Sequence, residues 1–458
     1  MMPLNVSCLP HLLCALLLLG HTTLPAQIPG GFATVKSDTP ETLSAARAAV
    51  SAQAGNLQLK EVESAQAQVV AGLNYRLGLR VLDGTKERRA EAVVWLQLDR
   101  TFKVVSWDWL DPAAPEAGPG MVQSEFIYES GPYPQIHATT LCETPGGLVA
   151  AWFGGTHEGH RDVCIWMSRQ INGRWTEGVQ AAHGIQPEGS RFPTWNPVLF
   201  LPKTGPLFLF YKVGPSPSGW WGEFKTSDDH GLTWKEAKKL PAGFLGPIKN
   251  KPVQLSSGEI LCPTSVETPE KASRWSVYFE RTSDLGETWQ KTPLLNDGAA
   301  IQAIQPSVLF LGSENLLAIG RSKQGRLFEL QSGDGGKNWG PMTLGRLPNN
   351  NSGTDALTMR DGRHLLVYNH VAPEPGQRNA RRTPLNVAVS KDGNSWDAAL
   401  ELETEQGEFS YPAVIQSQDG LVHISYTWNR RRVKHVVVDP NQFRVQPIVD
   451  GRWPGPAR

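Results

Sequence analysis

Hydrophobic and polar positions divide the chain into two parts with different periodicities. After residue 120, short apolar runs such as 147–153, 206–211, 316–320 and 364–368 alternate with clusters of turn-forming residues. Helical periodicity is nearly absent there, so the pattern predicts an all-β array over 121–445. The array should contain six units, which begin near Ile136, Trp195, Lys251, Gln305, Asp355 and Tyr411. We expect the last unit to be completed by pairing of 433–438 with 122–128.

The segment before residue 111 follows a different pattern. Residues 39–53 are Ala-rich, with Pro near the first turn and Gly just past the end, which predicts one helix. Three alternating stretches follow and predict antiparallel strands: 67–81, 90–98 and 102–110. One helix followed by strands predicts a small α+β unit over 27–110. The Pro/Gly/Ala-rich stretch 111–120 predicts a linker, and 446–458 remains as a C-terminal tail.

One phrase recurs at turns between the apolar runs. The Asp should accept hydrogen bonds from the backbone of a tight turn, the Gly should take a conformation closed to other residues, and the Trp should pack into the layer below. The copies are Ser227–Trp234, Thr282–Trp289, Ser332–Trp339 and the shorter Ser390–Trp396, and a fifth copy, Ser168–Trp175, lacks the Asp. The Trp residues recur every roughly 50–60 residues, which predicts a repeat architecture.

This phrase resembles the Asp-box of the sialidase superfamily. Further phrases are similar to a divergent bacterial sialidase-like group, namely those at 195–197, 211–214, 220–222, 247–252 and 350–355. The resemblance spans 121–445. It implies a mainly β fold, a six-bladed β-propeller, that acts on or binds carbohydrate. Trp220 and Trp221 are then either a platform for sugar stacking or ordinary packing residues.

The first unit resembles a cystatin, the family of papain-class protease inhibitors. The motifs that carry the resemblance are Gly30-Gly31-Phe32 and the pentapeptide Gln68, Val69, Val70, Ala71 and Gly72. In cystatins the N-terminal Gly, the Gln-Val-Val-Ala-Gly hairpin and a second hairpin with Pro-Trp form an inhibitory wedge, so the resemblance implies a hairpin at 68–72. Here Trp107 and Trp109 lie in the region of the third piece, and neither follows a Pro. The resemblance implies protease binding through Gly31 and residues 68–72; a spacer or dimerisation unit is the alternative.

Composition and the first residues indicate the compartment. Lys+Arg and Asp+Glu are balanced at 44 each, so no general charge attracts nucleic acid. The apolar run 12–19 followed by Ala26 predicts a signal peptide over 1–26, hence a secreted or periplasmic protein without a membrane segment after cleavage. An uncleaved anchor is the alternative. Three cysteines, Cys142, Cys164 and Cys262, would remain and are expected to be buried thiols with at most one disulfide.

The resemblance to sialidases implies which residues would act. Sialidases clamp the substrate carboxylate with a trio of arginines, attack with a Tyr activated by a Glu, and protonate the leaving oxygen with a carboxylate on a loop. Arg321 and Arg382 match the second and third arginines, and Arg326 lies near the former. Tyr411 matches the nucleophile. Glu158, or Asp162 as the second candidate, matches the acid/base.

Two positions depart from the family pattern. Gln135 stands where the first arginine belongs, with His137 at the following Pro position, and Gln305 stands where the activating Glu belongs. We expect His137 to replace that base if it reaches Tyr411, since an imidazole titrates near neutral pH. Lys251 is expected to restore part of the missing positive charge. The two histidines His157 and His160 sit on a Gly-containing loop, so no metal or other cofactor is expected.

These observations leave several functions open. The first is a secreted enzyme, an exo-acting glycosidase on an acidic sugar of the sialic or uronic type. A lyase is a variant, because Tyr and His can abstract a proton next to a uronate carboxylate. The second is a glycan-binding propeller without catalysis. The third is a cysteine-protease inhibitor whose propeller anchors it to glycans.

Overall fold

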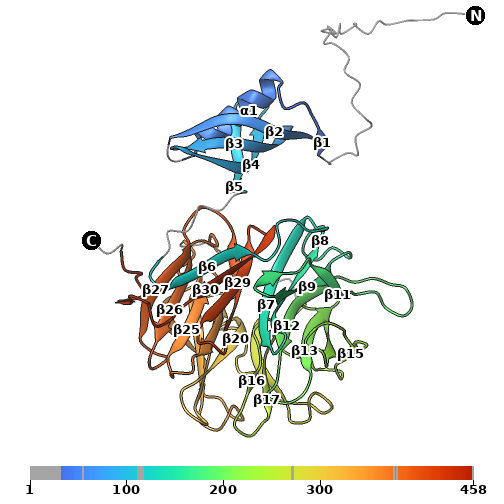
Figure 1. Ribbon diagram of the computed structural model, residues 1–458, viewed down its shortest axis with the longest axis vertical. Helices are drawn as coiled ribbons and strands as arrows, with labels where there is room; N and C mark the ends of the chain where they lie inside the picture. The colour runs from blue at the N-terminus through green and yellow to red at the C-terminus, as the bar shows by residue number, and fades with distance from the viewer. Residues whose placement is uncertain are drawn as a thin grey trace, which may run out of the picture. The chain divides into compact units, whose positions relative to one another are not determined.

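A computed structural model describes residues 32–53, 56–110, 118–269, 273–374, 377 and 380–455. The expected signal peptide, Gly31 and most of the expected linker lie outside these residues. The chain divides into two compact units, Met1–Asp111 and Pro112–Arg458. Each is built mainly from β-strands (Figure 1). Within the described residues, no helix has the length and apolar character that a membrane crossing requires.

The first unit packs helix α1 (Pro40–Ser51) against one antiparallel sheet. Thr39 caps the helix, because its hydroxyl accepts a hydrogen bond from the Thr42 amide at 3.2 Å, and Pro40 opens the first turn. The helix buries its alanines against the sheet around Leu77 and Leu79. The sheet contains, in order, β1 (Ala33–Thr34), β2 (Leu57–Val70), β3 (Gly72–Asp83), β4 (Lys86–Leu96) and β5 (Phe102–Trp109).

Two expectations for this sheet need correction. The stretch 67–81 is not one strand, because the chain reverses at Ala71 and Gly72 takes a φ of 110°. The tryptophans of the expected third inhibitory piece lie on β5, where Trp107 is buried in the core. The connection between β4 and β5 instead carries Leu98, whose exposed fraction is 82%. Since Leu73 pairs with Leu96, that connection lies at the same end of the sheet as Ala71.

The second unit contains six antiparallel sheets among its described residues. The first three are built from β7 (Gln135–Thr144), β8 (Gly147–Gly155), β9 (Cys164–Ile171), β10 (Arg174–Trp175) and β11 (Val179–Ala182); β12 (Thr194–Phe200), β13 (Leu207–Val213), β14 (Trp221–Ser227) and β15 (Lys238–Lys239); and β16 (Val253–Gln254), β17 (Ile260–Glu267), β18 (Trp275–Thr282) and β19 (Gln290–Lys291).

The other three sheets follow in the same chain order. They are built from β20 (Ala303–Phe310), β21 (Leu316–Ser322), β22 (Arg326–Ser332) and β23 (Thr343–Pro348); β24 (Asp355–Thr358), β25 (His364–Tyr368), β26 (Leu385–Ser390), β27 (Trp396–Glu403) and β31 (Gln446–Pro447); and β28 (Phe409–Gln416), β29 (Val422–Trp428), β30 (Arg432–Val438) and β6 (Met121–Phe126). The pairing of β30 with β6 confirms the predicted completion of the last unit.

Successive sheets pack face to face and bury their apolar strands between them. Val149 and Ile165 of the first sheet share a core with Leu209 and Tyr211 of the second. The first strands also meet: β7 contacts β12, β20 contacts β24, β24 contacts β28, and β28 contacts β7. The last contact joins the sixth sheet to the first, so residues far apart in the sequence come together there.

The repeated phrase forms the turn from the third strand of a sheet to the fourth, and it does so as predicted. In the second copy, Asp284 Oδ1 accepts the Thr288 amide at 2.8 Å, and the Gly286 amide donates to Thr282 Oγ1 at 2.9 Å. Gly286 has a φ of 92°, a conformation that side chains disfavour. The same Asp and Gly bonds recur in the other three complete copies.

The first strands of four sheets carry the same bulge, in which two residues face one residue of the next strand. At each bulge a residue other than Gly takes a positive φ: Ala138 (54°), Asn196 (32°), Gln305 (57°) and Tyr411 (52°). In three cases the next residue is Pro. Bulges re-aim side chains and are frequent next to functional sites, so these four positions are candidates for a functional site.

The three cysteines of the second unit, Cys142, Cys164 and Cys262, are buried and free. This confirms the prediction of buried thiols. The fold owes its stability to sheet packing, which a chain of this size can supply without disulfides.

Candidate functional site

Tyr411 lies at the bulge of β28, and four polar side chains gather around its ring. The His137 ring centroid is 4.0 Å away, Arg321 Cζ is 5.3 Å away, Arg382 Cζ is 5.6 Å away and Lys249 Nζ is 5.9 Å away. Tyr411 is 8% exposed. The structure therefore brings together Tyr411, His137 and two of the expected arginines, and it adds Lys249, which the sequence did not single out.

A half-buried carboxylate, Glu408, holds two arginines in the cluster. Its Oε1 lies 2.7 Å from Arg382 Nη1 and 2.9 Å from Arg430 Nε. Burial alone would raise the pKa of Glu408, but the charges of Arg382 and Arg430 outweigh it and hold the pKa below its ordinary value. Glu408 is therefore an anion that orients the two guanidinium groups.

Arg430 brings a third guanidinium to the place where the sequence lacks one. Its backbone carbonyl accepts the Ile136 amide at 2.8 Å, so it lies beside the start of β7. Gln135, where the resemblance to sialidases implied a substrate-binding residue in place of an arginine, is the neighbour of Ile136 and is half-buried. No side-chain bond joins Gln135 to the cluster in the part of the chain that the structure describes. The third cation thus comes from the turn between β29 and β30.

The loop between β8 and β9 delivers Glu158 to this cluster. Arg430 Nη1 lies 2.6 Å from Glu158 Oε2. Asp162 shapes the same loop, because its carboxylate accepts the Thr156 amide at 3.0 Å and the Thr156 hydroxyl at 2.6 Å. Burial opposes ionisation of Asp162, but the bonds from Thr156 and His160 prevail and lower its pKa to about 2. Asp162 therefore fixes the loop and is unsuited to donate a proton near neutral pH.

His137 reaches Tyr411, yet it is a weak base. Arg382 Nη1 lies 3.4 Å from His137 Nε2; because a guanidinium only donates, Nε2 accepts and Nδ1 carries the proton toward Thr427 Oγ1 at 3.0 Å. Burial lowers the pKa of His137 well below its ordinary value, and the positive charges of Arg430, Arg382, Arg321 and Lys249 lower it further. The expectation of a base that titrates near neutral pH is corrected accordingly.

Lys249, rather than Lys251, supplies positive charge beside Tyr411. Lys249 Nζ donates to the Thr354 carbonyl at 2.7 Å and to the Pro412 carbonyl. Burial lowers its pKa to about 7, with Asp355 opposing and Lys251 and Arg321 assisting the shift. Lys251 is held away by Asp355, whose Oδ2 lies 2.9 Å from its Nζ. The side chain that can exchange a proton near pH 7 is thus Lys249.

Several buried polar atoms near Lys249 have no hydrogen-bond partner among the described residues. They are Gln305 Oε1, Asn250 Oδ1, Ser352 Oγ and Thr354 Oγ1. Gly353, between the last two, packs against the Tyr411 ring so closely that a Cβ there would lie 3.2 Å from it. Buried polar groups are normally paired, so this group marks a place where water or substrate hydroxyls complete the bonding.

Arg321 and Arg326 have different surroundings although they are close in sequence. Arg321 is 6% exposed and donates from Nη1 to the Asn351 carbonyl at 3.0 Å. Arg326 begins β22 and is exposed, with its backbone paired to Pro348. Arg326 therefore stays outside the cluster, and Arg321 is the arginine that faces Tyr411.

Comparison with known proteins places this arrangement in a family. The model of a BNR repeat-like domain matches residues 146–424 of the chain. The chain belongs to this family. The match covers the four complete turn phrases of the BNR repeat-like protein, and it also covers the bulges at Asn196, Gln305 and Tyr411. A search of curated protein sequences finds no match.

Solved structures with the same fold include sialidases. A protein of unknown function from Dyadobacter fermentans is 16% identical, with a TM-score of 0.57 over 70% of this chain and 99% of that chain. The NanB sialidase from Streptococcus pneumoniae is 12% identical, with a TM-score of 0.56 over 83% and 89%. A leech intramolecular trans-sialidase is 11% identical, with a TM-score of 0.55 over 87% and 93%. The BNR repeat-like protein therefore has a sialidase-like fold.

Proposed function

We propose that the second unit is a six-bladed β-propeller and that the protein is a secreted or periplasmic glycosidase that removes a terminal acidic sugar. The six sheets in chain order, the contact of β28 with β7 and the completion of the last sheet by β6 support the propeller. The family and the sialidase-like fold support the carbohydrate ligand. An amino terminus of the exported protein near residue 27 would test the signal peptide.

The observation that carries the enzymatic proposal is the approach of two guanidinium groups to one phenol. Arg321 and Arg382 lie 5.3 and 5.6 Å from the Tyr411 ring. Guanidinium forks bind a carboxylate bidentately, so they would place the anomeric carbon of an acidic sugar near the Tyr411 hydroxyl.

Each remaining group has a role in this scheme. Tyr411 attacks the anomeric carbon, and Glu158 gives its proton to the leaving oxygen before it activates the water that releases the sugar. Glu158 must be protonated for the first step, and its contact with Arg430 keeps it oriented. Lys249, with a pKa of about 7, is the group beside Tyr411 that can take up the phenolic proton. Glu408 positions Arg382 and Arg430.

A substrate panel with matched variants tests this function. The purified protein is incubated with sialylated and uronate-containing glycans, and released reducing sugar is measured. Tyr411→Phe should lower turnover by about a thousandfold or more, since it removes the nucleophile. Arg326→Ala is the control, because this exposed arginine lies outside the cluster, and it should retain activity.

Three other outcomes of this panel would identify a different activity. An unsaturated uronate product would show a lyase. Glycan binding without turnover, unchanged in Tyr411→Phe, would show a binding propeller. No release and no binding across the panel would reject the carbohydrate proposal altogether.

A second candidate function belongs to the first unit and rests on an exposed apolar edge. Val69 and Val70 are 61% and 41% exposed on one hairpin, and Leu98 is 82% exposed on the other connection at that end of the sheet. Grouped apolar side chains on a surface mark binding sites, and this edge coincides with the cystatin-like pentapeptide. We infer that it binds a papain-class protease. The full chain should inhibit papain; Val70→Asp should weaken inhibition, whereas Val105→Asp on β5 should not.

A further inference from the structure

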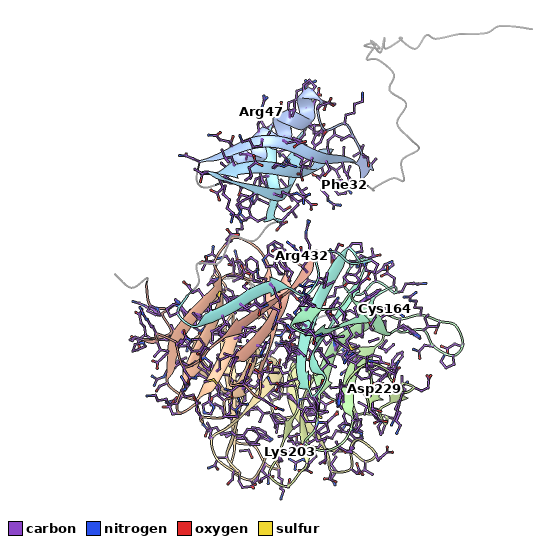
Figure 2. All side chains as sticks on the ribbon, viewed as in Figure 1. Phe32, Arg47, Cys164, Lys203, Asp229 and Arg432 are labelled. Atoms are coloured by element: carbon purple, nitrogen blue, oxygen red, sulfur yellow. The ribbon has the colours of Figure 1, made fainter. Side chains whose placement is uncertain are left out.

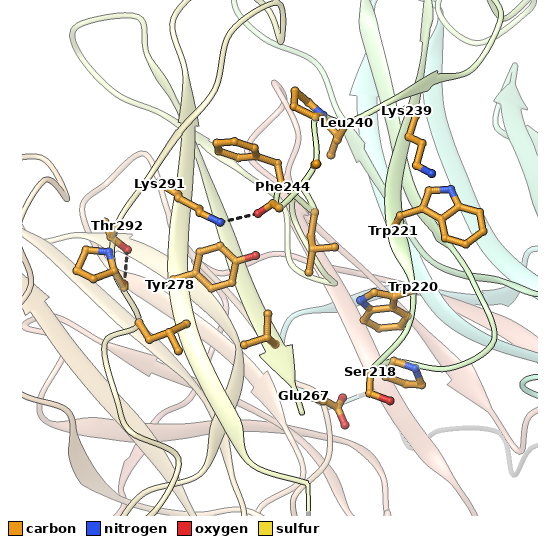
Figure 3. A pocket seen from close by; sticks show the side chains of 18 residues that line it. Ser218, Trp220, Trp221, Lys239, Leu240, Phe244, Glu267, Tyr278, Lys291 and Thr292 are labelled. Carbon is orange, nitrogen blue, oxygen red and sulfur yellow. Dashed lines mark hydrogen bonds between the residues drawn. The ribbon is translucent and has the colours of Figure 1, made fainter. Parts of the chain in front are cut away.

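A cavity of about 770 Å³ opens between the second and third sheets of the BNR repeat-like unit. Its walls come from 217–221, 239–245, 266–267 and 291–294, together with Tyr278 of β18. Figure 3 shows Trp220 and Tyr278 on opposite sides, with the Tyr278 hydroxyl directed toward Trp220. Its volume lies within the roughly 300–1,000 Å³ typical of sites for small ligands.

Glu267 connects this cavity to the Tyr411 cluster. Its side chain lines the cavity, and its Oε2 accepts the Trp275 indole N–H at 3.0 Å. The Trp275 ring lies 5.1 Å from Arg321 Cζ, and the same guanidinium lies 5.3 Å from the Tyr411 ring. The side chains of Glu267, Trp275 and Arg321 therefore lie one after another between the cavity and the phenol of Tyr411. A glycan whose terminal unit lies at Tyr411 would have to extend past these side chains to place a further unit in the cavity.

The polar groups of the cavity suit an anionic sugar. Lys239 Nζ lies 4.4 Å from the Trp221 ring, and Lys291 Nζ donates to the Gly243 carbonyl at 2.6 Å. Because an ammonium has three donors, Lys291 keeps donors for a ligand. The indole N–H of Trp220 is buried and has no partner among the described residues. Aromatic faces with several donors match a sugar ring, which has apolar faces and a polar rim, whereas a purely apolar group would leave the donors unsatisfied.

We propose that this cavity binds a second, anionic sugar unit of the same glycan whose terminal unit lies at Tyr411. The proposal rests on the proposed function, since it places the remainder of that substrate. Trp220 contacts a face of the sugar ring, Lys291 and Lys239 bind the carboxylate or sulfate, and Glu267 accepts a hydroxyl. The protein then prefers an oligosaccharide to a single sugar.

Binding to defined glycans tests the proposal without relying on turnover. An array of sialylated, uronate-containing and sulfated glycans, each as a monosaccharide and as oligosaccharides of two to six units, is probed with the full chain. Dissociation constants of the bound glycans are then compared among variants. The cavity variants are Trp220→Ala and Lys291→Ala. The site variant is Arg382→Ala, and the control is Lys203→Ala, an exposed lysine that does not line the cavity (Figure 2).

The expected result is a selective loss. Both cavity variants should bind oligosaccharides about tenfold more weakly and monosaccharides as the wild type does, since one truncated aromatic or charged contact commonly costs that factor. Arg382→Ala should lose both, and Lys203→Ala should lose neither. Trp220→Phe, which keeps an aromatic face, should retain most of the binding, and unchanged monosaccharide binding by Trp220→Ala shows that this variant is folded.

The opposite results separate this proposal from the one it rests on. If the cavity variants bind oligosaccharides like the wild type while Arg382→Ala does not, the second site is rejected and the function at Tyr411 stands. If Arg382→Ala binds every glycan like the wild type, the function at Tyr411 is rejected, and the claim of one continuous glycan with it. Absence of binding to any glycan rejects both.

Discussion

The ring of His137 stacks against the ring of Tyr411 at 4.0 Å, with an angle of 46° between their planes. His137 lies on β7 and Tyr411 on β28, the first strands of the first and last sheets. The contact therefore forms only when the two ends of the second unit meet. The candidate site therefore forms only when the sixth sheet packs against the first, and its geometry depends on that contact.

The His137 imidazole should titrate well below the pH at which an ordinary histidine does. Its burial and four neighbouring positive charges lower its pKa well below the ordinary 6.5. NMR titration of labelled histidines, with His137→Asn for assignment, measures this directly. A signal that titrates near 6.5 and disappears in the variant would contradict the burial and charge argument.

Glu408→Gln should destabilise the protein by about 1–3 kcal/mol in urea unfolding, because Arg382 and Arg430 lose the anion between them. Turnover on any substrate found should fall as well, since both guanidinium groups lose their orientation. Glu129→Gln is the matched control. Its carboxylate pairs with Arg432 at 2.9 Å but is 80% exposed, so the change should stay within about 0.5 kcal/mol. Equal effects of the two substitutions would contradict this account of Glu408.

Stability should rise with pH between about 7 and 10.5 through Lys249. The pKa of Lys249 is about 7 in the folded protein and 10.5 for an ordinary lysine, so the unfolded chain binds more protons across this window. Deprotonation removes the cost of a buried charge as pH rises, and no cost remains above 10.5. Lys249→Met should flatten the slope of the unfolding free energy against pH, whereas Lys203→Met should leave it unchanged. An unaltered slope in Lys249→Met would mean that the ammonium is better solvated than its burial indicates.

Asp284→Asn should lower the melting temperature at neutral pH and have little effect near pH 2. Hydrogen bonds from the Thr288 hydroxyl and amide lower the pKa of Asp284 from 3.8 to about 2. The stabilisation is therefore present above about pH 4 and disappears as pH falls through about 2. Melting temperatures of both proteins at pH 6 and near pH 2 test this. A constant difference at both pH values would show that the ionised form is not what stabilises the turn.

Sequence alone could predict the repeated turns and the helix because both depend on neighbours in the chain. Asp284, Gly286 and Thr288 lie within five positions, and Thr39 caps a helix that begins at the next residue. The turn at Ala71 does not follow from the alternation of apolar residues, which continues through it into β3, although the cystatin-like pentapeptide 68–72 implied a hairpin there. The position of Leu98 at the same end of the sheet as Ala71 follows from strand pairing, which the local sequence pattern does not contain.

The candidate site was only partly predictable. Tyr411, Arg321 and Arg382 lie in stretches that resemble sialidase motifs. The sequence favours Lys251 over Lys249, which lies two positions earlier. Either lysine fits the phrase, and only the carbonyls of Thr354 and Pro412, far away in sequence, draw Lys249 inward. Arg430 stands in a run of three arginines, and nothing local distinguishes it from the next two. Its role depends on Glu408 and Glu158, which come from other parts of the chain.

The recurring bulge holds different side chains in the same backbone geometry. Asn196, Gln305 and Tyr411 occupy equivalent backbone positions, each with a positive φ and a following Pro. The same bulge can therefore carry an amide or a phenol, and the strands around it do not have to change. Such a scaffold can exchange its reactive groups one substitution at a time, so the chemistry presented at Gln305 or Tyr411 can change while the architecture stays intact.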